Sequence, residues 1–423
     1  MKDMVTMDKK IILTKLNIDK LQPATMFAVY ENNKASKVEL FYEDDNFVID
    51  NIYVAHVNDL VKNINAAFVE YAPSKKGYLA LEGNENIFFT NKKNTNKVCE
   101  GDNLLVQVKK EPKGTKDAVV STQIEFANQY IVLTYGKPGI AVSSKITDED
   151  KIAQLRKLGE SFMSTIDFDS NMYPLFTEEI FMSILERTGV IFRTDCQNIA
   201  DISTIREYLS TEFSQCLSVF HKAMSSKGKT LIKEATNPLI KLTEEALKNS
   251  GLEESSTEII TDDKDIYDLL IALGFKVRWY LDELLPLYKL YSVESVLDEI
   301  ISRKVWLKSG GYLIIDYTEA MTVIDVNTGK FIQGKDRNKT ILKINIEAAI
   351  EAMRQLRLRN ISGIIIIDFI DMKDEESKRL LMNCLRTEAA KDELKTSIID
   401  MTKLNLVEIT RKKTRDKVQV RKR

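Results

Sequence analysis

The chain has 423 residues, of which 44% are hydrophobic and 29% charged. This is the composition of an ordinary globular protein, and the length favours two to about four domains over one compact core. Because 61 basic and 63 acidic residues nearly cancel, the average charge excludes a generally basic nucleic-acid binder, and any such site must be a local patch.

The four cysteines are scattered and form no CxxC pair; they are Cys99, Cys196, Cys216 and Cys384. This pattern argues against a disulfide framework and a zinc knuckle, and favours reduced thiols. No N-terminal stretch is apolar enough for a signal peptide, and no segment has about 18 uninterrupted apolar residues. We therefore expect a soluble, cytoplasmic protein.

Between Thr25 and Gly114, short alternating segments from MFAVYE to NLLVQVKKE predict an all-β module. About five closely spaced strands fit a small barrel such as an OB-fold, which commonly binds single-stranded nucleic acid. Phe68 and Tyr78 flank the loop APSKKG, and Lys110 and Lys116 follow. Taken singly these are ordinary strand residues, but rings beside cations are what single-stranded RNA needs for stacking.

The segment from Gln123 to Ala200 mixes strands and a helix, and it ends in the apolar run GVIF followed by Arg193 and Thr194. This pair is either an ordinary surface pair or a phosphate contact, since a guanidinium offers a bidentate fork and a hydroxyl adds one donor. Helical periodicity then runs from Ile202 to about Asn249.

The segment after Ser309 carries the strongest chemical pattern. The apolar strands YLIID and MTVIDV precede a helical stretch, TILKINIEAAIEAMRQLRLRN, and a β-branched run, SGIIIIDFIDM. Strand, amphipathic helix and strand form a crossover unit, so the strands that precede and follow the helix should be parallel or nearly adjacent. The β-branched run SGIIIIDFIDM, which contains GIIIID, should be buried on both faces of its sheet.

Asp325 and Asp368 each end one of these strands. Neighbouring carboxylates repel each other, and a hard divalent cation removes that cost. Mg²⁺ is favoured because it takes few protein carboxylates and bridges to phosphate, while Asn327 could orient Asp325 or meet the phosphate. A single strand-end Asp is more often a cap or turn residue. Composition and spacing alone therefore indicate metal-dependent phosphoryl chemistry as one possibility and nothing more specific.

Two stretches, TEAMTVIDVNTGKF and RQLRLRNISGIIIIDFIDM, resemble the catalytic region of the RNase E/G endoribonucleases, and MTKLNLVEITRKKTR also matches that pattern. The resemblance covers nearly the whole chain. It implies that Asp325 and Asp368 bind one Mg²⁺ and that Asn327 positions Asp325. It also implies that Phe68 and Tyr78 stack bases near Lys116, and that Val132, Arg193 and Thr194 surround a 5′-monophosphate.

The fold implied by this resemblance is α/β and multidomain. A split RNase H-like domain, residues 1–35 and 218–281, carries two insertions: an OB-fold module over residues 36–120 and a 5′-end sensor over residues 121–217. A DNase I-like catalytic domain follows over residues 282–423.

The chain departs from the family pattern at four places. Asn128 stands where the sensor often has Gly, the loop GKPGIAVSSKI has fewer arginines, Ser362 replaces the first of two glycines, and Asn405 replaces another glycine. No Cys follows Cys384, so we expect no zinc site and no zinc-linked dimer, and no downstream small domain.

The resemblance implies cleavage of single-stranded, A/U-rich RNA by a metal-activated water, leaving a 5′-phosphate and a 3′-hydroxyl, in rRNA or tRNA processing or mRNA decay. One alternative is a catalytically weak RNA-binding paralogue that acts as an RNA-processing or ribosome-assembly factor; the presence of both aspartates and Asn327 argues against it. A DNA nuclease is a second alternative, which the OB-type module and sensor disfavour.

Overall fold

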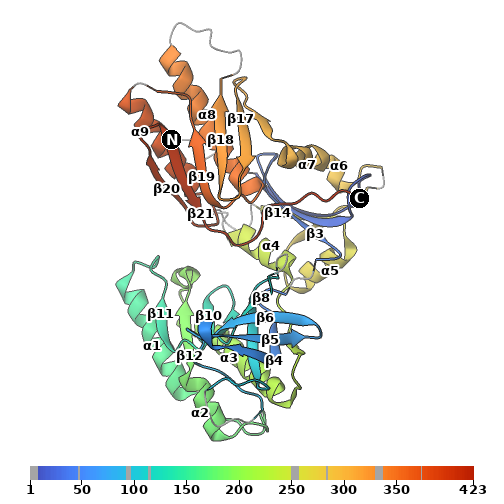
Figure 1. The fold of residues 1–423 in the computed structure, drawn as a ribbon, viewed down its shortest axis with the longest axis vertical. Helices are drawn as coiled ribbons and strands as arrows, with labels where there is room; N and C mark the ends of the chain where they lie inside the picture. The colour runs from blue at the N-terminus through green and yellow to red at the C-terminus, as the bar shows by residue number, and fades with distance from the viewer. Residues whose placement is uncertain are drawn as a thin grey trace. The chain divides into compact units, whose positions relative to one another are not determined.

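The computed structural model divides the chain into two compact units, Met1–Asp45 with Asn237–Arg423, and Asn46–Thr236. The residues that it describes are 8–45, 48–91, 97–112, 116–248, 257–282, 284–328, 337–372 and 374–423. Figure 1 shows helices and strands mixed throughout both units, which confirms the predicted mixed α/β class.

The first unit contains a five-stranded sheet of order β15-β14-β1-β2-β3. Its strands are β1 (Lys9–Leu16), β2 (Ala24–Glu31), β3 (Lys34–Tyr42), β14 (Thr257–Thr261) and β15 (Val277–Trp279). The helices of this region are α4 (Pro238–Lys248), α5 (Lys264–Ala272), α6 (Leu287–Leu290) and α7 (Val293–Ile301). Alternating residues of β1 and β2 face two hydrophobic cores, one shared with α4 and α5 and one with α6 and α7. The sheet is therefore covered by helices on both faces.

A second sheet of this unit has the order β16-β17-β18-β19-β21-β20. Its strands are β16 (Lys304–Trp306), β17 (Tyr312–Tyr317), β18 (Met321–Asn327), β19 (Gly363–Asp368), β20 (Thr396–Met401) and β21 (Leu406–Arg411). Two helices, α8 (Arg337–Leu358) and α9 (Glu375–Ala389), lie beside these strands (Figure 1). Their apolar side chains share one core with alternate residues of the sheet.

Only one face of this second sheet is buried by those helices. Ile365 and Ile367 of β19 are fully buried, whereas Ile364 is 49% exposed. The prediction that the run GIIIID is buried on both faces was therefore wrong. Strand side chains alternate between faces, and α8 and α9 contribute their core side chains to the face that carries Ile365 and Ile367.

The second unit contains a closed β-barrel. Strands β4 (Ile52–Val61), β5 (Ala66–Ala72), β6 (Lys75–Ala80), β8 (Ala118–Ser121) and β7 (Asn103–Lys110) pair in that order, and β4 pairs with β7 to close the ring. A short 3₁₀ turn, η1 (Lys62–Ile64), joins β4 to β5, and β13 (Thr230–Lys233) pairs with β4 from outside the ring. The closed ring of five strands is consistent with an OB-fold.

Two strands that the sequence pattern grouped with this module belong elsewhere. The segments ATMFAVYE and KASKVELFY form β2 and β3, which pair with each other and, through β2, with β1. Alternation alone predicts a strand but not its partner, so the first barrel strand is β4.

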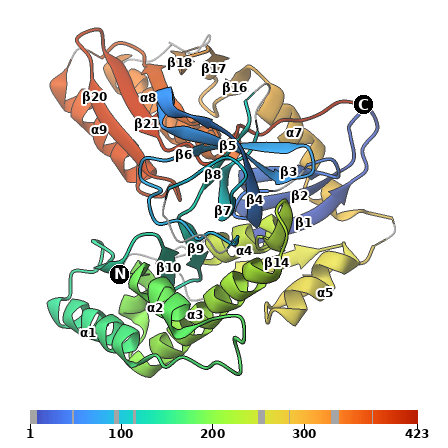
Figure 2. The same ribbon diagram turned by 60° about the horizontal axis from the view of Figure 1, so that its bottom comes forward.

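The rest of this unit is a four-stranded sheet of order β11-β12-β10-β9 with three helices. Its elements are β9 (Ile124–Ala127), β10 (Ile131–Tyr135), β11 (Gly139–Val142), β12 (Thr188–Phe192), α1 (Glu149–Thr165), α2 (Glu178–Glu186), η2 (Thr194–Asn198) and α3 (Ile202–Ser225). Figure 2 shows α1 and α3 side by side, and their apolar faces enter one core with β9, β10 and β12. Among the described residues, no helix is long and apolar enough to cross a membrane.

A buried ion pair ties the end of β21 to its neighbours. The Arg411 guanidinium lies 2.7 Å from an Asp392 carboxylate oxygen, and the side chains are 5% and 1% exposed. Arg411 also donates to the Asn360 side chain and the Ile361 carbonyl, both at 3.0 Å. Burial raises the pKa of Asp392, but the hydrogen bond and charge of Arg411 outweigh it and leave the pKa lowered.

We expect Asp392→Asn to lower the free energy of unfolding by about 3–5 kcal/mol near pH 7, because it leaves Arg411 buried without its counter-charge. Since the folded pKa of Asp392 is lowered, its contribution is present above the unfolded value of about 4 and is lost as pH falls through the folded value. Urea unfolding of the wild type and the variant at pH 7 and at pH 3 measures this difference in the free energy of unfolding.

The control for this measurement is Glu375→Gln, which breaks an exposed pair with Lys378 in the same unit. It should change the free energy of unfolding by less than about 0.5 kcal/mol at either pH. An Asp392→Asn effect that is equally small, or one that grows toward pH 3, would contradict the assigned role of the pair.

Candidate active site

Asp325 and Asp368 lie side by side at the ends of two parallel strands. Strands β18 and β19 pair in parallel from Met321 with Ile364 to Asp325 with Asp368. Helix α8 separates the two strands in the chain, so the predicted crossover unit is confirmed. Both carboxylates are exposed.

Strand alternation places these carboxylates on the face away from the helices. Ile324 and Val326 of β18 enter the core beneath α8 and α9, as does Ile367 of β19. Asp325 and Asp368 are offset by one residue from these positions and therefore point to the open face. Because both side chains are exposed on this face, a substrate can reach both groups.

The pair carries uncompensated negative charge. Partial burial raises the pKa of Asp368, and the nearby charges of Asp325 and Asp371 raise it further. In the part of the chain that the structure describes, no Lys, Arg or His forms an ion pair with Asp325 or Asp368. Two adjacent carboxylates without a basic partner fit a hard divalent cation that retains several of its waters.

Asn327 and Asp371 complete the surroundings of the pair. The Asn327 amide donates a 2.7 Å hydrogen bond to a carboxylate oxygen of Asp325, as expected of a residue that orients this group. Asp371 was missed by the sequence analysis, although it lies three residues after Asp368 in the motif DFIDM. It accepts a hydrogen bond of 3.2 Å from the Asn405 amide. Asn405 has φ at 61°, a conformation that Asn tolerates.

The barrel brings Phe68 and Tyr78 together on one row of its surface. Phe68 pairs with Tyr78 across β5 and β6, and Val119 of β8 pairs with both Tyr78 and Lys110. The two rings lie 5.9 Å apart at 67° and are half-buried. Lys110 is exposed at the end of this row. Lys116 is also exposed and lies between β7 and β8.

The three predicted sensor residues lie in one region of the four-stranded sheet. Val132 pairs with Ile191, two residues before Arg193. The Arg193 guanidinium donates a 2.7 Å hydrogen bond to the Asn128 carbonyl, and the Thr194 hydroxyl lies 2.9 Å from that of Ser143. One of the five N–H donors of Arg193 is used by this bond, and the side chain is exposed.

Asn128 has a structural task in this region. Its side-chain oxygen accepts hydrogen bonds of 2.9 Å from the backbone N–H groups of Tyr130 and Ile131, and its amide donates to Glu212 at 3.2 Å. Asn closes turns in this way. These bonds fix the turn that contains Asn128, and its backbone carbonyl accepts the hydrogen bond from Arg193.

A model of the ribonuclease E/G family matches residues 125–414. The chain belongs to the ribonuclease E/G family. It is 31% identical over 415 residues to ribonuclease G of Salmonella typhimurium, covering 93% of this chain and 79% of the relative. Against ribonuclease G of Escherichia coli K12 it is 30% identical over 413 residues, with the same coverage. Against ribonuclease E of Buchnera aphidicola it is 30% identical over 380 residues, 86% of this chain and 36% of the relative. Membership of this family identifies the chain as an endoribonuclease.

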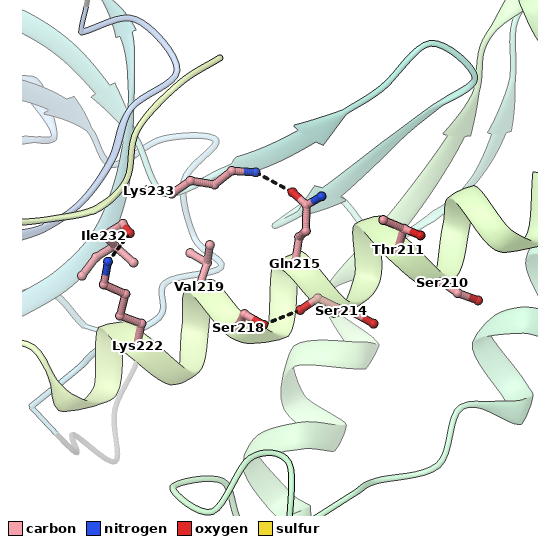
Figure 3. A pocket seen from close by; sticks show the side chains of 9 residues that line it. All are labelled: Ser210, Thr211, Ser214, Gln215, Ser218, Val219, Lys222, Ile232 and Lys233. Carbon is pink, nitrogen blue, oxygen red and sulfur yellow. Dashed lines mark hydrogen bonds between the residues drawn. The ribbon is translucent and has the colours of Figure 1, made fainter. Parts of the chain in front are cut away.

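A groove of about 620 Å³ runs along α3 and β13 in the second unit and contains none of the predicted site residues. Figure 3 shows Lys233 reaching Gln215 and Lys222 reaching the carbonyl of Ile232, at 2.9 Å each. Serine and threonine side chains of α3, together with Val219, line the rest. Because both lysines already have neutral partners within the fold, we assign this groove no part in the site.

We expect Asp368→Asn to leave the melting temperature in EDTA at low salt unchanged or about 1–2 °C higher, because the substitution removes repulsion from Asp325. Added Mg²⁺ should stabilise the wild type, by about 2.7 kcal/mol at a hundred times Kd, but not the variant. Differential scanning calorimetry measures both.

Asp316→Asn is the matched control. Asp316 lies on the same sheet face, but Arg303 neutralises it through two hydrogen bonds of 2.5 and 2.6 Å. Its replacement should not raise the melting temperature and should leave the Mg²⁺ response intact. An Mg²⁺ response that survives in Asp368→Asn would show that the cation binds elsewhere.

Proposed function

We propose that this chain is an Mg²⁺-dependent endoribonuclease of single-stranded RNA whose metal is held by Asp325 and Asp368. The observation that carries the proposal is the in-register parallel pairing of these two residues. Partial burial and the nearby charge of Asp325 both raise the pKa of Asp368. When bound, Mg²⁺ would lower the pKa of a coordinated water and stabilise negative charge on the attacked phosphate.

The chain's own residues supply orientation and substrate binding. The Asn327 amide holds one oxygen of Asp325, so the carboxylate keeps one rotamer. On the barrel, Phe68 and Tyr78 offer neighbouring rings on which bases stack, and Lys110 and Lys116 attract the RNA backbone. Stacking accepts any base, so we infer a loose preference for A/U-rich RNA, which is least structured.

We further propose the products and the cellular role. Attack by water on a backbone phosphorus would leave a 5′-phosphate and a 3′-hydroxyl, and the role would be rRNA or tRNA processing or mRNA decay. The support is membership of the ribonuclease E/G family and the ribonuclease G relatives.

We also propose the domain assignment suggested by the sequence: RNase H-like over residues 1–35 and 218–281, an OB-fold within 36–120 whose first strand is β4, a 5′-end sensor over 121–217 and a DNase I-like domain over 282–423. The closed barrel supports the second of these. A compact unit that begins at Asn46 and ends at Thr236 supports an insertion into the rest of the chain.

Asp325→Asn and Asp368→Asn should each lower kcat by about 10²- to 10³-fold on an unstructured RNA with a 5′-monophosphate, because each removes one carboxylate from the metal site. Asp316→Asn should retain wild-type kcat. Gel assays with Mg²⁺ or EDTA measure cleavage, and filter binding in EDTA measures RNA affinity, which the variants should keep.

The two assays together separate the proposal from its alternatives. Equal cleavage by the wild type and both aspartate variants would place the active centre elsewhere. Binding without cleavage by the wild type would instead favour the RNA-binding paralogue, and faster cleavage of single-stranded DNA would favour a DNA nuclease.

We also propose that Val132, Arg193 and Thr194 bind a 5′-monophosphate. The wild type should cleave 5′-monophosphorylated RNA about tenfold faster than 5′-triphosphorylated RNA, and Arg193→Gln should abolish this preference. The reason is that charge-assisted hydrogen bonds contribute about 1.5–3 kcal/mol. Arg206→Gln, an exposed guanidinium on α3, is the control and should keep the preference. If the wild type cleaves both RNAs at one rate, the sensor assignment fails while the assignment of the metal site stands.

A further inference from the structure

The edge strand β16 presents a tryptophan and a lysine beside a tyrosine of β17. The Lys304 ammonium lies 3.8 Å from the centre of the Trp306 ring and 3.7 Å from that of Tyr312. The two rings are 5.3 Å apart at 65°. We call these three residues the aromatic–lysine cluster.

This cluster lies on the same sheet face as the aspartate pair. Val305 and Leu313 point into the core beneath the helices, so their neighbours along β16 and β17 point to the open face. Trp306 pairs with Tyr312, and Tyr312 pairs with Asn327. The tryptophan therefore lies in the same cross-strand row as the residue that orients Asp325.

A second row leads from the lysine to both carboxylates. Lys304 pairs with Ile314, Ile314 with Asp325, and Asp325 with Asp368. Neighbouring strands are about 4.8 Å apart, so two strand spacings, about 10 Å, separate Lys304 from Asp325. A nucleotide next to the phosphate held at the carboxylates would reach the cluster.

The exposure of Trp306 is not explained by the fold. Trp306 is 64% exposed, although tryptophan is on average highly buried. A lysine on an edge strand prevents pairing with another chain, but that protection needs no tryptophan. A large open ring beside a cation is the combination that binds a nucleic-acid base and its phosphate.

We propose that the aromatic–lysine cluster is a subsite for the RNA strand, in which a base next to the cleaved phosphodiester stacks on Trp306 and Lys304 contacts its phosphate. The inference rests on the proposed function, because it takes the aspartate pair as the place of cleavage. Trp306 is then a positioning residue, and the subsite accepts any base, since every base has a ring face to stack.

The sequence offers a direct spectroscopic test, because its only tryptophans are Trp279 and Trp306. Trp279→Phe leaves Trp306 as the sole tryptophan, and Trp306→Phe leaves Trp279, in β15. Titration in EDTA with an unstructured RNA oligonucleotide should give saturable quenching in Trp279→Phe and little change in Trp306→Phe. Equal responses in the two variants would overturn the proposal.

A kinetic arm tests the same residue in cleavage with Mg²⁺. Trp306→Ala should raise KM about five- to tenfold, the lower part of the range for one stacked base, with kcat changed less than about twofold; Trp306→Phe should restore most of the affinity. The matched control is Tyr317→Ala. Tyr317 lies on β17, the strand next to β16, and strand alternation places it on the other face of the sheet. Its ring is 42% exposed, and the Lys417 ammonium lies 4.1 Å from the ring centre.

The outcomes separate this inference from the proposed function. An unchanged KM in Trp306→Ala, with cleavage still lost in Asp325→Asn, removes the subsite alone. Undiminished cleavage in Asp325→Asn removes the proposed site, whatever the fluorescence shows. Trp306 fluorescence that changes with protein concentration in the absence of RNA would assign the ring to a contact with a second copy and overturn the subsite.

Discussion

The parallel pairing of β18 with β19 is the constraint on which the candidate site depends. Parallel strands need a crossover connection, and α8 provides it by packing its apolar stripe onto the sheet. The register sets Asp325 opposite Asp368. Because strand side chains alternate, a slip of one residue would turn one carboxylate into the helix-covered core. The same burial that stabilises the sheet therefore fixes the distance and the direction of the two charges.

The charged motif RQLRLRN at the end of α8 holds this crossover in place. Arg359 is 2% exposed and donates 2.8 Å hydrogen bonds to the carbonyls of Ser302 and Glu299 after and within α7. Arg354 donates to the Ala35 carbonyl of β3 and pairs with Glu351 at 2.7 Å. Buried charges are costly unless each is paired. The motif by which the chain resembles the family therefore also joins the second sheet to the first sheet through these hydrogen bonds.

The sequence predicted this region well because its signals are local. Apolar runs that end in Asp and enclose an amphipathic helix leave few topologies, and the adjacency of Asp325 and Asp368 follows from them. Strand partners in the rest of the fold depend on distant residues, which is why β2 and β3 were grouped with the barrel. The exposure of the Ile364 side chain and the cross-strand row from Trp306 to Asn327 both depend on how strands and helices pack together. Alternation along a single strand could not predict either of them.

The two faces of the second sheet, which carries the candidate site, differ in polarity and exposure. The face beneath α8 and α9 is apolar and closed, which keeps the strands in one register. On the other face, a covering element would have to bury Asp325 and Asp368 without a counter-charge, at a cost of several kcal/mol for each ion. The divalent cation that we propose for this site can reach that charge only from solvent. The open face of this sheet, on which Ile364 is 49% exposed, therefore keeps both carboxylates in contact with solvent.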